Sequence, residues 1–177
     1  TEAEVAIVAK GGTFPNRKRD EAEVKNYFIA LNYIDDLITQ DTKEITAKMV
    51  QTIHGCVMNG KPKPTSYRDG QNVIRESGSG NIIYLPPEWK EVPQLMSELV
   101  DWVNAQLEEG ELPAPIIAGI AHYQFATIHP YYDGNGRTAR LLTNLILHLS
   151  GYGLKGIYSL EEYYARNLQS YYSAISV

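Results

Sequence analysis

Apolar residues recur at helical spacing along the first third of the chain. Between residues 22 and 39 they stand three or four positions apart, with charged and polar residues on the other faces, which predicts an amphipathic helix. The same spacing runs from residue 45 to 57, and Asp41 with Glu44 predicts a capping box at the start of that helix. We expect this second helix to end before Asn59.

The middle of the chain replaces this spacing with short β-prone runs. Two such runs lie within residues 73–85, on either side of a turn rich in glycine and serine at 77–81, and they predict a small β-hairpin. Helical spacing returns between residues 95 and 107, where Pro93 is expected in the first turn of the helix. A further helix is predicted at about 115–128.

A proline marks the end of that helix. Pro130 disfavours helical geometry at the residue before it, so we expect the helix to stop with His129 at its exit. Another helix should begin near Arg137, and Ser159 predicts the cap of a final helix at about 160–175. The pattern as a whole is mostly helical, with one hairpin.

Length and composition fit one hydrophobic core. The chain has 177 residues, of which 44% are hydrophobic and 21% charged, and this leaves little room for a second core. We therefore expect a mostly α, single-domain helical bundle with one small β-hairpin, in which residues 1–19 form an N-terminal segment and residues 20–177 the domain. Because the chain starts at Thr1 and ends just after an apolar helical pattern, we also expect flanking segments.

Charge and hydropathy exclude several classes of partner. The formal net charge of −5 argues against the broad basic surface of a nucleic-acid-binding protein, so an anion site must be local. No stretch approaches the ~18–20 consecutive apolar residues of a membrane span, and the first residues lack a signal-peptide pattern. The single cysteine, Cys56, cannot form an intrachain disulfide. We expect a cytoplasmic protein without nucleic-acid or membrane partners.

Candidate chemistry is concentrated between residues 129 and 140, which have the sequence HPYYDGNGRTAR. Two glycines flank Asn135 at the start of a predicted helix, so backbone amides can converge on an anion where the helix dipole adds positive potential. Arg137 and Arg140 are three positions apart, on one side of the first helical turn, and guanidinium groups suit phosphate oxygens. The pattern predicts a phosphate cradle.

Two further residues of this stretch could act on a bound phosphate. Asp133 is a hard oxygen ligand suited to Mg²⁺, and His129 can titrate near neutral pH. Each feature alone could be a surface loop with solvated side chains. The combination of base, metal ligand, anion cradle and arginines within twelve residues favours a functional site.

The stretch resembles the signature of the Fic-domain family, HPFx(D/E)GNGRxxR, and departs from it only at Tyr131, where the family has phenylalanine. Residues 67–74 and 83–89 resemble the flap region of the family, and 160–175 resembles its closing helix with a Tyr-Tyr pair. The resemblance covers about residues 20–177 and implies the Fic fold.

The resemblance also implies an activity of the AMP-transferring branch of the Fic/Doc superfamily. Such an enzyme is a protein adenylyltransferase, which moves AMP from its co-substrate ATP, with Mg²⁺, to a Ser, Thr or Tyr hydroxyl of a target protein or of itself. By position, the implied catalytic residues are His129 as the base, Asp133 as the Mg²⁺ ligand and Arg137. The implied nucleotide-binding residues are Gly134, Asn135, Gly136, Arg137, Arg140 and Tyr172, and the implied target-aligning flap is Ile82, Ile83 and Tyr84.

Other interpretations stay open at this point. Tyr172 could equally be a packing residue on a helix face. The same cradle could take another nucleotide donor such as UTP or CDP-choline, or serve to remove AMP from a modified protein. A kinase-like relative is disfavoured because that branch has lysine where this chain has Gly136. A non-catalytic binding module would have no need of the base His129, and a homo-oligomer is one option for the assembly.

The N-terminal stretch differs from that of many Fic proteins. Many Fic proteins carry an inhibitory stretch Ser/Thr-x-x-x-Glu-Gly/Asn, but residues 4–13 have no Ser or Thr at the expected place and no acid before Gly12. Either this form lacks self-inhibition, or the sequence joins across residues absent from it.

His122 is expected to be packed and hydrogen-bonded rather than a metal ligand. The remaining predictions are structural roles for His54, His148 and Cys56, and a solvated loop at 17–19.

Overall fold

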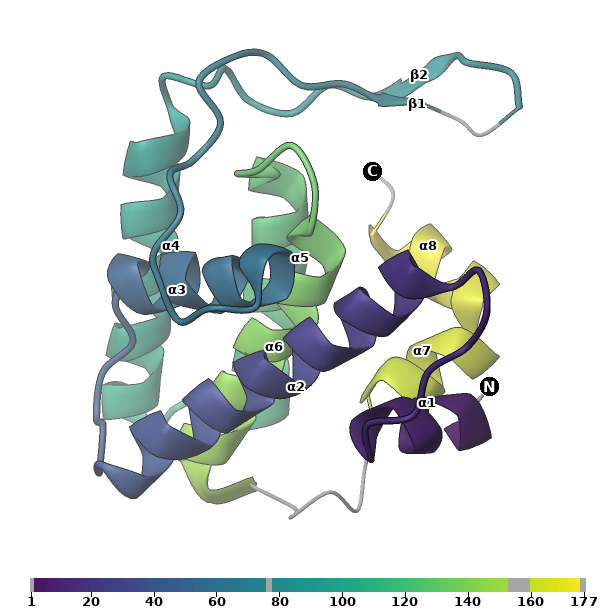
Figure 1. The fold of residues 1–177 in the computed structure, drawn as a ribbon. Coiled ribbons are helices and arrows are strands. Elements are labelled where there is room, and N and C mark those ends of the chain that lie inside the picture. The colour runs from purple at the N-terminus through teal and green to yellow at the C-terminus, as the bar shows by residue number, and fades with distance from the viewer. Residues whose placement is uncertain (1, 76–77, 153–159, 176–177) are drawn as a thin grey trace. The chain divides into compact units, whose positions relative to one another are not determined.

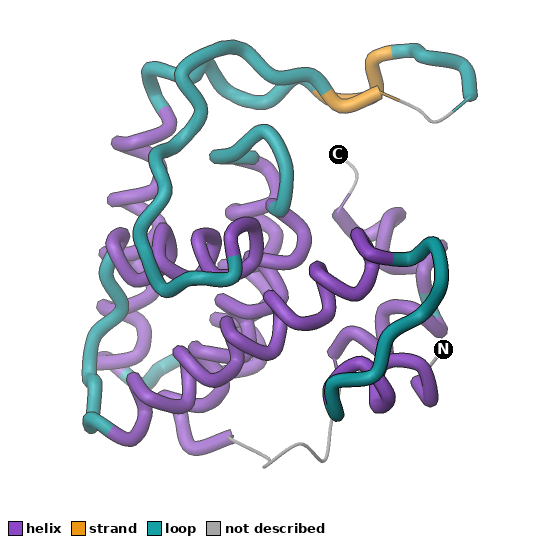
Figure 2. The backbone as a smooth tube through the Cα atoms, viewed as in Figure 1, coloured by secondary structure: helices purple, strands orange, loops and turns teal. Residues whose placement is uncertain are grey.

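The computed structural model describes residues 2–75, 78–152 and 160–175. The chain divides into two compact units, Thr1–Ser66 and Tyr67–Val177. Helices make up most of the described chain (Figure 2), and the strands among the described residues form one hairpin. The prediction of a mostly α fold with one small β-hairpin is confirmed.

The first unit consists of α1 (Glu2–Ala9), α2 (Lys18–Thr39) and α3 (Ala47–Asn59), of which α2 contacts both α1 and α3 (Figure 1). The capping box predicted at Asp41 is wrong. Asp41 lies in the turn after α2 with φ 56°, and α3 begins later because the Thr46 hydroxyl accepts a hydrogen bond from the amide of Met49 at 3.2 Å. Helix α3 runs through Asn59, slightly further than expected, and Gly60 adopts the left-handed conformation that closes a helix.

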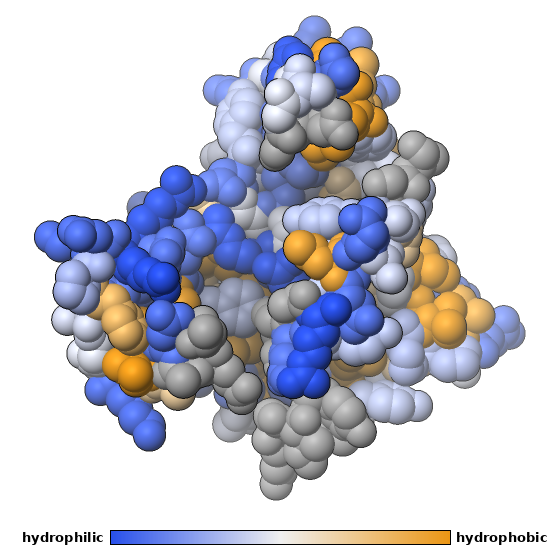
Figure 3. Space-filling view, turned by 90° about the vertical axis from the view of Figure 1, so that its right-hand side faces the viewer, coloured by the Kyte–Doolittle hydropathy of each residue, from blue (hydrophilic) through white to orange (hydrophobic). Residues whose placement is uncertain are grey.

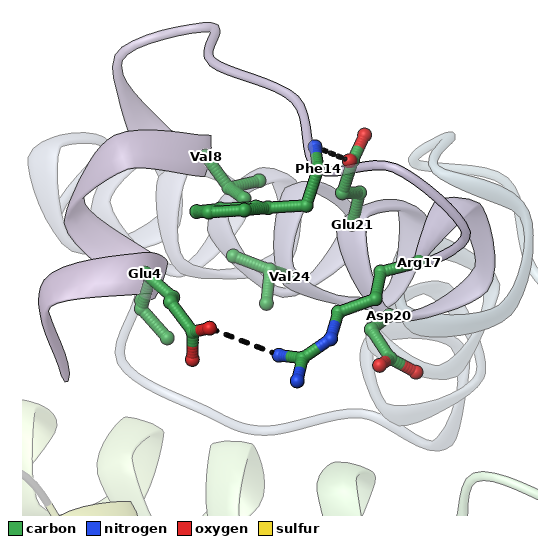
Figure 4. Close-up of a pocket in the computed structure, with 8 residues that line it drawn as sticks. Glu4, Val8, Phe14, Arg17, Asp20, Glu21 and Val24 are labelled. Atoms are coloured by element: carbon green, nitrogen blue, oxygen red, sulfur yellow. Dashed lines mark hydrogen bonds and ion pairs between the residues drawn. The ribbon is translucent and has the colours of Figure 1, made fainter. Parts of the chain in front are cut away.

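The N-terminal segment is more ordered than the sequence indicated. Residues 2–9 form α1, and the loop predicted at 17–19 is wrong because α2 begins at Lys18. Arg17 donates a hydrogen bond to the Glu4 carboxylate at 3.1 Å, and buried Glu21 accepts one from the amide of Phe14. In the small pocket between α1 and α2, Phe14 lies against Val8 beside these pairs (Figure 4). Contacts between α1 and the start of α2 therefore hold the segment.

The second unit is built around α4 (Val92–Glu109), α5 (Ala114–Ile128) and α6 (Asn135–Leu147). Helix α5 contacts both α4 and α6 (Figure 1). Its buried alanines, Ala118 and Ala121, allow a close approach of α6, and Phe125 of α5 is fully buried, as are Leu141 and Leu145 of α6. All three helices lie where their apolar spacing predicted them, with Pro93 in the first turn of α4. Their packing fixes the two ends of the α5–α6 loop.

The hairpin precedes these helices in the chain. Strand β1 (Ile74–Arg75) pairs antiparallel with β2 (Ile82–Tyr84), so that Ile74 faces Tyr84 and Arg75 faces Ile82 with an irregularity between the two pairs. The predicted hairpin is confirmed, although the strands are shorter than the β-prone runs.

The C-terminal part differs from the single helix predicted at about 160–175. After α6 a π-helical turn, η1 (His148–Tyr152), is followed by α7 (Leu160–Arg166) and α8 (Leu168–Ile175). The break falls at Asn167, whose backbone and side-chain amides both donate to the carbonyl of Tyr163, at 3.1 and 2.9 Å. The predicted cap, Ser159, lies outside the described residues.

None of the helices in the described ranges is both long and apolar enough to cross a membrane.

Candidate active site

His129 lies at the point where α5 ends. Its backbone has φ 50° and ψ 59°, and its amide donates to the carbonyl of Phe125 at 3.0 Å, which closes the helix. A left-handed conformation is uncommon for a residue other than glycine. Pro130 follows directly, so the chain turns away here as the sequence predicted. The surroundings must hold this turn in place.

Arg68 supplies that support. Its side chain is buried and donates hydrogen bonds to the carbonyls of His129 at 3.0 Å and Gly70 at 3.1 Å, and also to the carbonyl of Pro87. Its backbone amide donates to the carbonyl of Pro130 at 2.9 Å. Burial lowers the pKa of the guanidinium from its ordinary value. One side chain thus connects the loop after α5 to both ends of the segment that carries the hairpin.

A hydrogen bond defines which nitrogen of the His129 ring carries the proton. Its Nδ1 lies 3.3 Å from the carbonyl oxygen of Ala126, and because a carbonyl can only accept, Nδ1 carries the proton. In the neutral ring the lone pair is therefore on Nε2. Burial lowers the pKa of His129, the hydrogen bond to Ala126 opposes this, and the charge of Arg68 adds to the lowering. The net lowering of the pKa favours the neutral ring, whose Nε2 lone pair can accept a proton.

Asn135 closes the loop from the other side. Its side chain is buried, with Oδ1 accepting from the amide of Tyr131 at 3.0 Å and Nδ2 donating to the carbonyl of Tyr131 at 2.7 Å. The Tyr131 ring is buried near Phe125 and Tyr67, at centroid distances of 6.4 and 5.6 Å. Tyrosine thus fills the position of the family's phenylalanine. Asn135 would contribute its backbone amide to a ligand, because its side chain is used inside the loop.

The start of α6 has the geometry of an anion cradle. Gly134 is left-handed, with φ 77° and ψ 0°, and the first helical bond runs from the amide of Thr138 to its carbonyl at 2.9 Å. The amides of Asn135 and Gly136 precede that bond at the positive end of the helix dipole. The conformation of Gly134 favours glycine, as the sequence pattern required.

Charged side chains surround this cradle. Asp133 forms an ion pair with Arg137 at 3.3 Å, and its Oδ1 accepts from the amide of Gly134 at 2.6 Å. A Cβ placed on Gly136 would lie 3.5 Å from a terminal nitrogen of Arg140, so the second guanidinium also lies beside the cradle. The structure brings the acidic residue and both arginines to the first turn of α6.

Asp133 suits a magnesium ion that bridges phosphates. Its side chain is 57% exposed, and the described residues contain no group of three or more potential metal ligands. Mg²⁺ commonly uses one or two carboxylates together with substrate phosphates rather than a cage made only of protein groups. A single exposed carboxylate next to an anion cradle fits this mode.

The three predicted flap residues have different environments. Ile82 and Ile83 are exposed, at 54% and 59%, whereas Tyr84 is half-buried. Its hydroxyl donates to the carbonyl of Thr127 on α5 at 2.8 Å. Apolar side chains gather on one side of the hairpin, the lobe at the top of Figure 3. Tyr84 therefore anchors the hairpin, and the two isoleucines are its accessible part.

The sequence did not indicate the part that Tyr171 takes. Tyr172, the predicted nucleotide contact, is exposed on α8 with its ring 5.4 Å from that of Tyr171. The Tyr171 hydroxyl instead lies 3.0 Å from Nε2 of His122, which is buried, and Nδ1 of His122 lies 3.0 Å from the Thr143 hydroxyl. Burial lowers the pKa of His122 to about 4. The prediction of a packed, hydrogen-bonded His122 is confirmed.

Two residues of the first unit also have the predicted structural character. His54 is buried, with Nδ1 at 2.6 Å from the Thr65 hydroxyl. Cys56 is buried, and burial raises the pKa of its thiol to about 11, so it is not a reactive thiolate at neutral pH.

Comparison with models of protein families identifies the family of this chain. The model of the Fic/DOC family matches residues 44–147, which include the whole signature. The chain belongs to the Fic/DOC family.

Several Fic proteins are similar over most of the chain. Protein adenylyltransferase fic-1 of Caenorhabditis elegans is 32% identical over 166 residues, which is 90% of this chain and 31% of the relative. Protein adenylyltransferase Fic of Nematostella vectensis is 33% identical over 127 residues, 70% of this chain and 27% of the relative. The chain thus spans between a quarter and a third of the length of these curated relatives.

A solved Fic structure shares the fold. The crystal structure of a Fic-domain-containing signalling protein from Bacteroides thetaiotaomicron superposes with a TM-score of 0.75 at 28% identity, covering 85% of this chain and 57% of that chain. The helical Fic fold expected from the signature is therefore confirmed.

The sequence did not predict the contacts that Arg68 and Tyr171 make in this site. An arginine is ordinarily a surface residue, and nothing in the spacing around Arg68 predicts its burial among carbonyls. Tyr171 follows the same apolar helical pattern as its neighbours. Only the packing of α8 against α5 distinguishes it from them.

Proposed function

We propose that this Fic domain is a protein adenylyltransferase, which transfers AMP from ATP to a Ser, Thr or Tyr hydroxyl of a target protein. The observation that carries the proposal is the His129 ring with its lone pair on Nε2, six residues before α6 starts at the glycine-flanked Asn135, on a helix that carries two arginines. The curated relatives named protein adenylyltransferases support the same activity.

The proposed reaction is an in-line displacement at the α-phosphorus of ATP. Nε2 of His129 takes the proton of the target hydroxyl while the hydroxyl oxygen forms a bond to the α-phosphorus. The bond from that phosphorus to the bridging oxygen breaks, and pyrophosphate leaves. Such transfers need mainly positioning and charge stabilisation, which the amides of the cradle, Arg137 and Arg140 would provide. A positioned base typically adds about 10²–10⁴-fold to the rate.

Mg²⁺ would be held by Asp133 together with the phosphates of the nucleotide. When bound, it neutralises phosphate charge and orients the leaving pyrophosphate. The ion pair between Asp133 and Arg137 keeps the carboxylate beside the cradle, where such an ion is needed. Tyr172, exposed on α8, would lie beside the adenine.

The target segment would add to the hairpin as an extended strand. Strand addition uses backbone hydrogen bonds for affinity and tolerates many side chains. Ile82 and Ile83 are exposed for this contact, and the bond from Tyr84 to Thr127 keeps the hairpin on the helix that ends at His129. The hydroxyl of the target would thereby be delivered to the base.

The test is to follow which phosphate label enters protein. The domain is incubated with Mg²⁺, a cell lysate and ATP labelled at either the α- or the γ-phosphate, and modified peptides are weighed. We expect α-label in protein, no γ-label, and the mass of an adenylyl group on Ser, Thr or Tyr. Transfer of γ-label would make the domain a kinase.

Parallel incubations separate the remaining alternatives. UTP and CDP-choline replace ATP in two of them, and a protein that already carries AMP is the substrate in a third. Modification by UTP or CDP-choline in place of ATP would identify another donor, and loss of AMP would identify a removing enzyme. Tight nucleotide binding without any transfer would indicate a non-catalytic module and contradict the proposal.

A further inference from the structure

The buried contacts of His122 form a hydrogen-bond chain with a defined direction. The Thr143 hydroxyl donates to the carbonyl of Ala139 at 2.9 Å, so its single proton is used there. Towards Nδ1 of His122, at 3.0 Å, the Thr143 oxygen can then only accept. His122 therefore carries its proton on Nδ1, and its Nε2 accepts from the hydroxyl of Tyr171 at 3.0 Å.

This direction determines what Tyr171 can offer on its other side. Because its proton points to His122, the lone pairs of its oxygen are left to accept hydrogen bonds. Burial raises the pKa of the Tyr171 hydroxyl, and the nearby Arg140 side chain lowers it, so the guanidinium lies close to this oxygen. Hydrogen bonds in which every donor points the same way polarise and strengthen one another in a buried environment. The series from Thr143 through His122 thus ends with an acceptor oxygen near the Arg140 guanidinium.

Packing keeps Tyr171 in this place. Its ring meets His122 edge-on at a centroid distance of 5.7 Å and lies 4.6 Å from the ring of Tyr164 on α7. Neighbouring helices therefore fix the ring, and the hydroxyl has little freedom to turn away from Arg140. The Arg140 guanidinium in turn lies beside the cradle, because a Cβ placed on Gly136 would be 3.5 Å from one of its terminal nitrogens.

We propose that Tyr171, supported by His122 and Thr143, is a positioning residue that holds the Arg140 guanidinium in the orientation that contacts the terminal phosphate of the nucleotide. The inference rests on the proposed function, which assigns Arg140 to that phosphate. An arginine side chain is long and has many rotamers, so fixing it before the ligand binds lowers the entropy lost on binding.

The proposal predicts a selective loss of affinity. Tyr171→Phe removes the hydroxyl and keeps the ring. We expect the Kd for ATP with Mg²⁺ to rise about tenfold, as for loss of one hydrogen bond to a charged group, while the Kd for AMP changes by less than about twofold. Isothermal titration calorimetry on the whole chain measures both constants. Tyr163→Phe is the matched control, because this exposed tyrosine belongs to the same aromatic cluster, and both constants should stay unchanged.

A double variant separates positioning from a general structural role. In the Arg140→Ala background, Tyr171→Phe should cause no further loss of ATP affinity, because the group that it positions is absent. A further loss of the same size in the double variant, or an equal loss for ATP and AMP in Tyr171→Phe, would overturn the proposal.

The assignment of Arg140 is tested by the single Arg140→Ala variant. Equal Kd changes for ATP and AMP in that variant would contradict the proposed function at Arg140, and this inference with it. A selective effect of Arg140→Ala without one of Tyr171→Phe would overturn this inference alone. The binding measurements do not depend on whether AMP is transferred to protein.

Thr143→Val provides a second variant that leaves Tyr171 intact. The substitution removes the hydroxyl that accepts the Nδ1 proton of His122, at the end of the hydrogen-bond series away from Arg140. The Kd for ATP should therefore rise as in Tyr171→Phe but by less, about two- to threefold. Unchanged ATP affinity in a folded Thr143→Val protein, checked by circular dichroism, would count against the supporting role of His122 and Thr143.

Discussion

The signature loop at 129–140 and the hairpin at 74–84 belong to the same unit, yet they are held in opposite ways. In the loop, the buried side chains of Asn135 and Arg68 bond to the backbone on both sides of the turn. In the hairpin, Ile74 pairs with Tyr84 and Arg75 with Ile82, with an irregularity between the two pairs, and Ile82 and Ile83 are exposed.

The difference corresponds to the two kinds of ligand proposed for them. A nucleotide has a fixed shape, so a site that binds its phosphates gains from a backbone whose amides are held in place before binding. A protein segment varies in sequence, and an exposed strand edge can pair with any extended backbone. The loop should therefore control the chemistry, and the hairpin should control access of the target.

The largest effect is expected in the loop. His129→Ala should lower the transfer rate by about 10²–10⁴-fold, because the proton acceptor is lost, and change the Kd for ATP by only a few-fold. Rates are measured with α-labelled ATP and a fixed protein target. His148→Ala, the loss of a half-buried histidine outside the site, serves as the control and should keep its rate. Retained activity in His129→Ala would remove His129 from the mechanism.

A smaller effect is expected in the hairpin. Ile83→Pro removes a backbone amide and restricts φ in β2, so transfer to a protein target should fall by about tenfold while ATP affinity stays the same. Ile83→Ala keeps the amide and should lose much less. If the alanine variant were as poor as the proline variant, the isoleucine side chain, and not strand pairing, would be what recognises the target.

The sequence predicted those parts of the molecule that depend on local pattern. Apolar spacing located α2, α4 and α5, and the turn residues at 77–81 located the hairpin. The sequence also predicted the backbone turns at glycine and proline. Gly134 is left-handed, and α5 ends at His129, the residue before Pro130. These features are determined by neighbours in the chain, which a sequence displays directly.

The features that were missed depend on contacts between distant residues. The order of residues 2–21 depends partly on the pairing of Arg17 with Glu4, thirteen positions apart. The support of His129 depends on Arg68, which is 61 positions away, and the contact between His122 and Tyr171 spans 49. Periodicity carries no information at such separations. The capping error at Asp41 is of another kind, because two capping candidates competed and Thr46 makes the bond.

The smallest expected effect is the change of the transfer rate with pH, which depends on His129 in the loop and should not depend on the hairpin. Burial lowers the pKa of His129 below the ordinary 6.5. The protonated ring cannot accept a proton, so activity should fall as pH falls through this lowered pKa. At pH 6.5 more than half of the molecules are already active, and the rate should rise less than about twofold between pH 6.5 and 8. Initial rates with α-labelled ATP at constant ionic strength measure the profile.

The hairpin variant Ile83→Pro is the control for this profile. It should lower the rate at every pH without moving the midpoint, because the groups that shift the pKa of His129 include Ala126 and Arg68 but not Ile83. A midpoint above 6.5 would show that bound phosphate charge outweighs burial, and a midpoint that moves with the hairpin variant would show that the two regions are coupled.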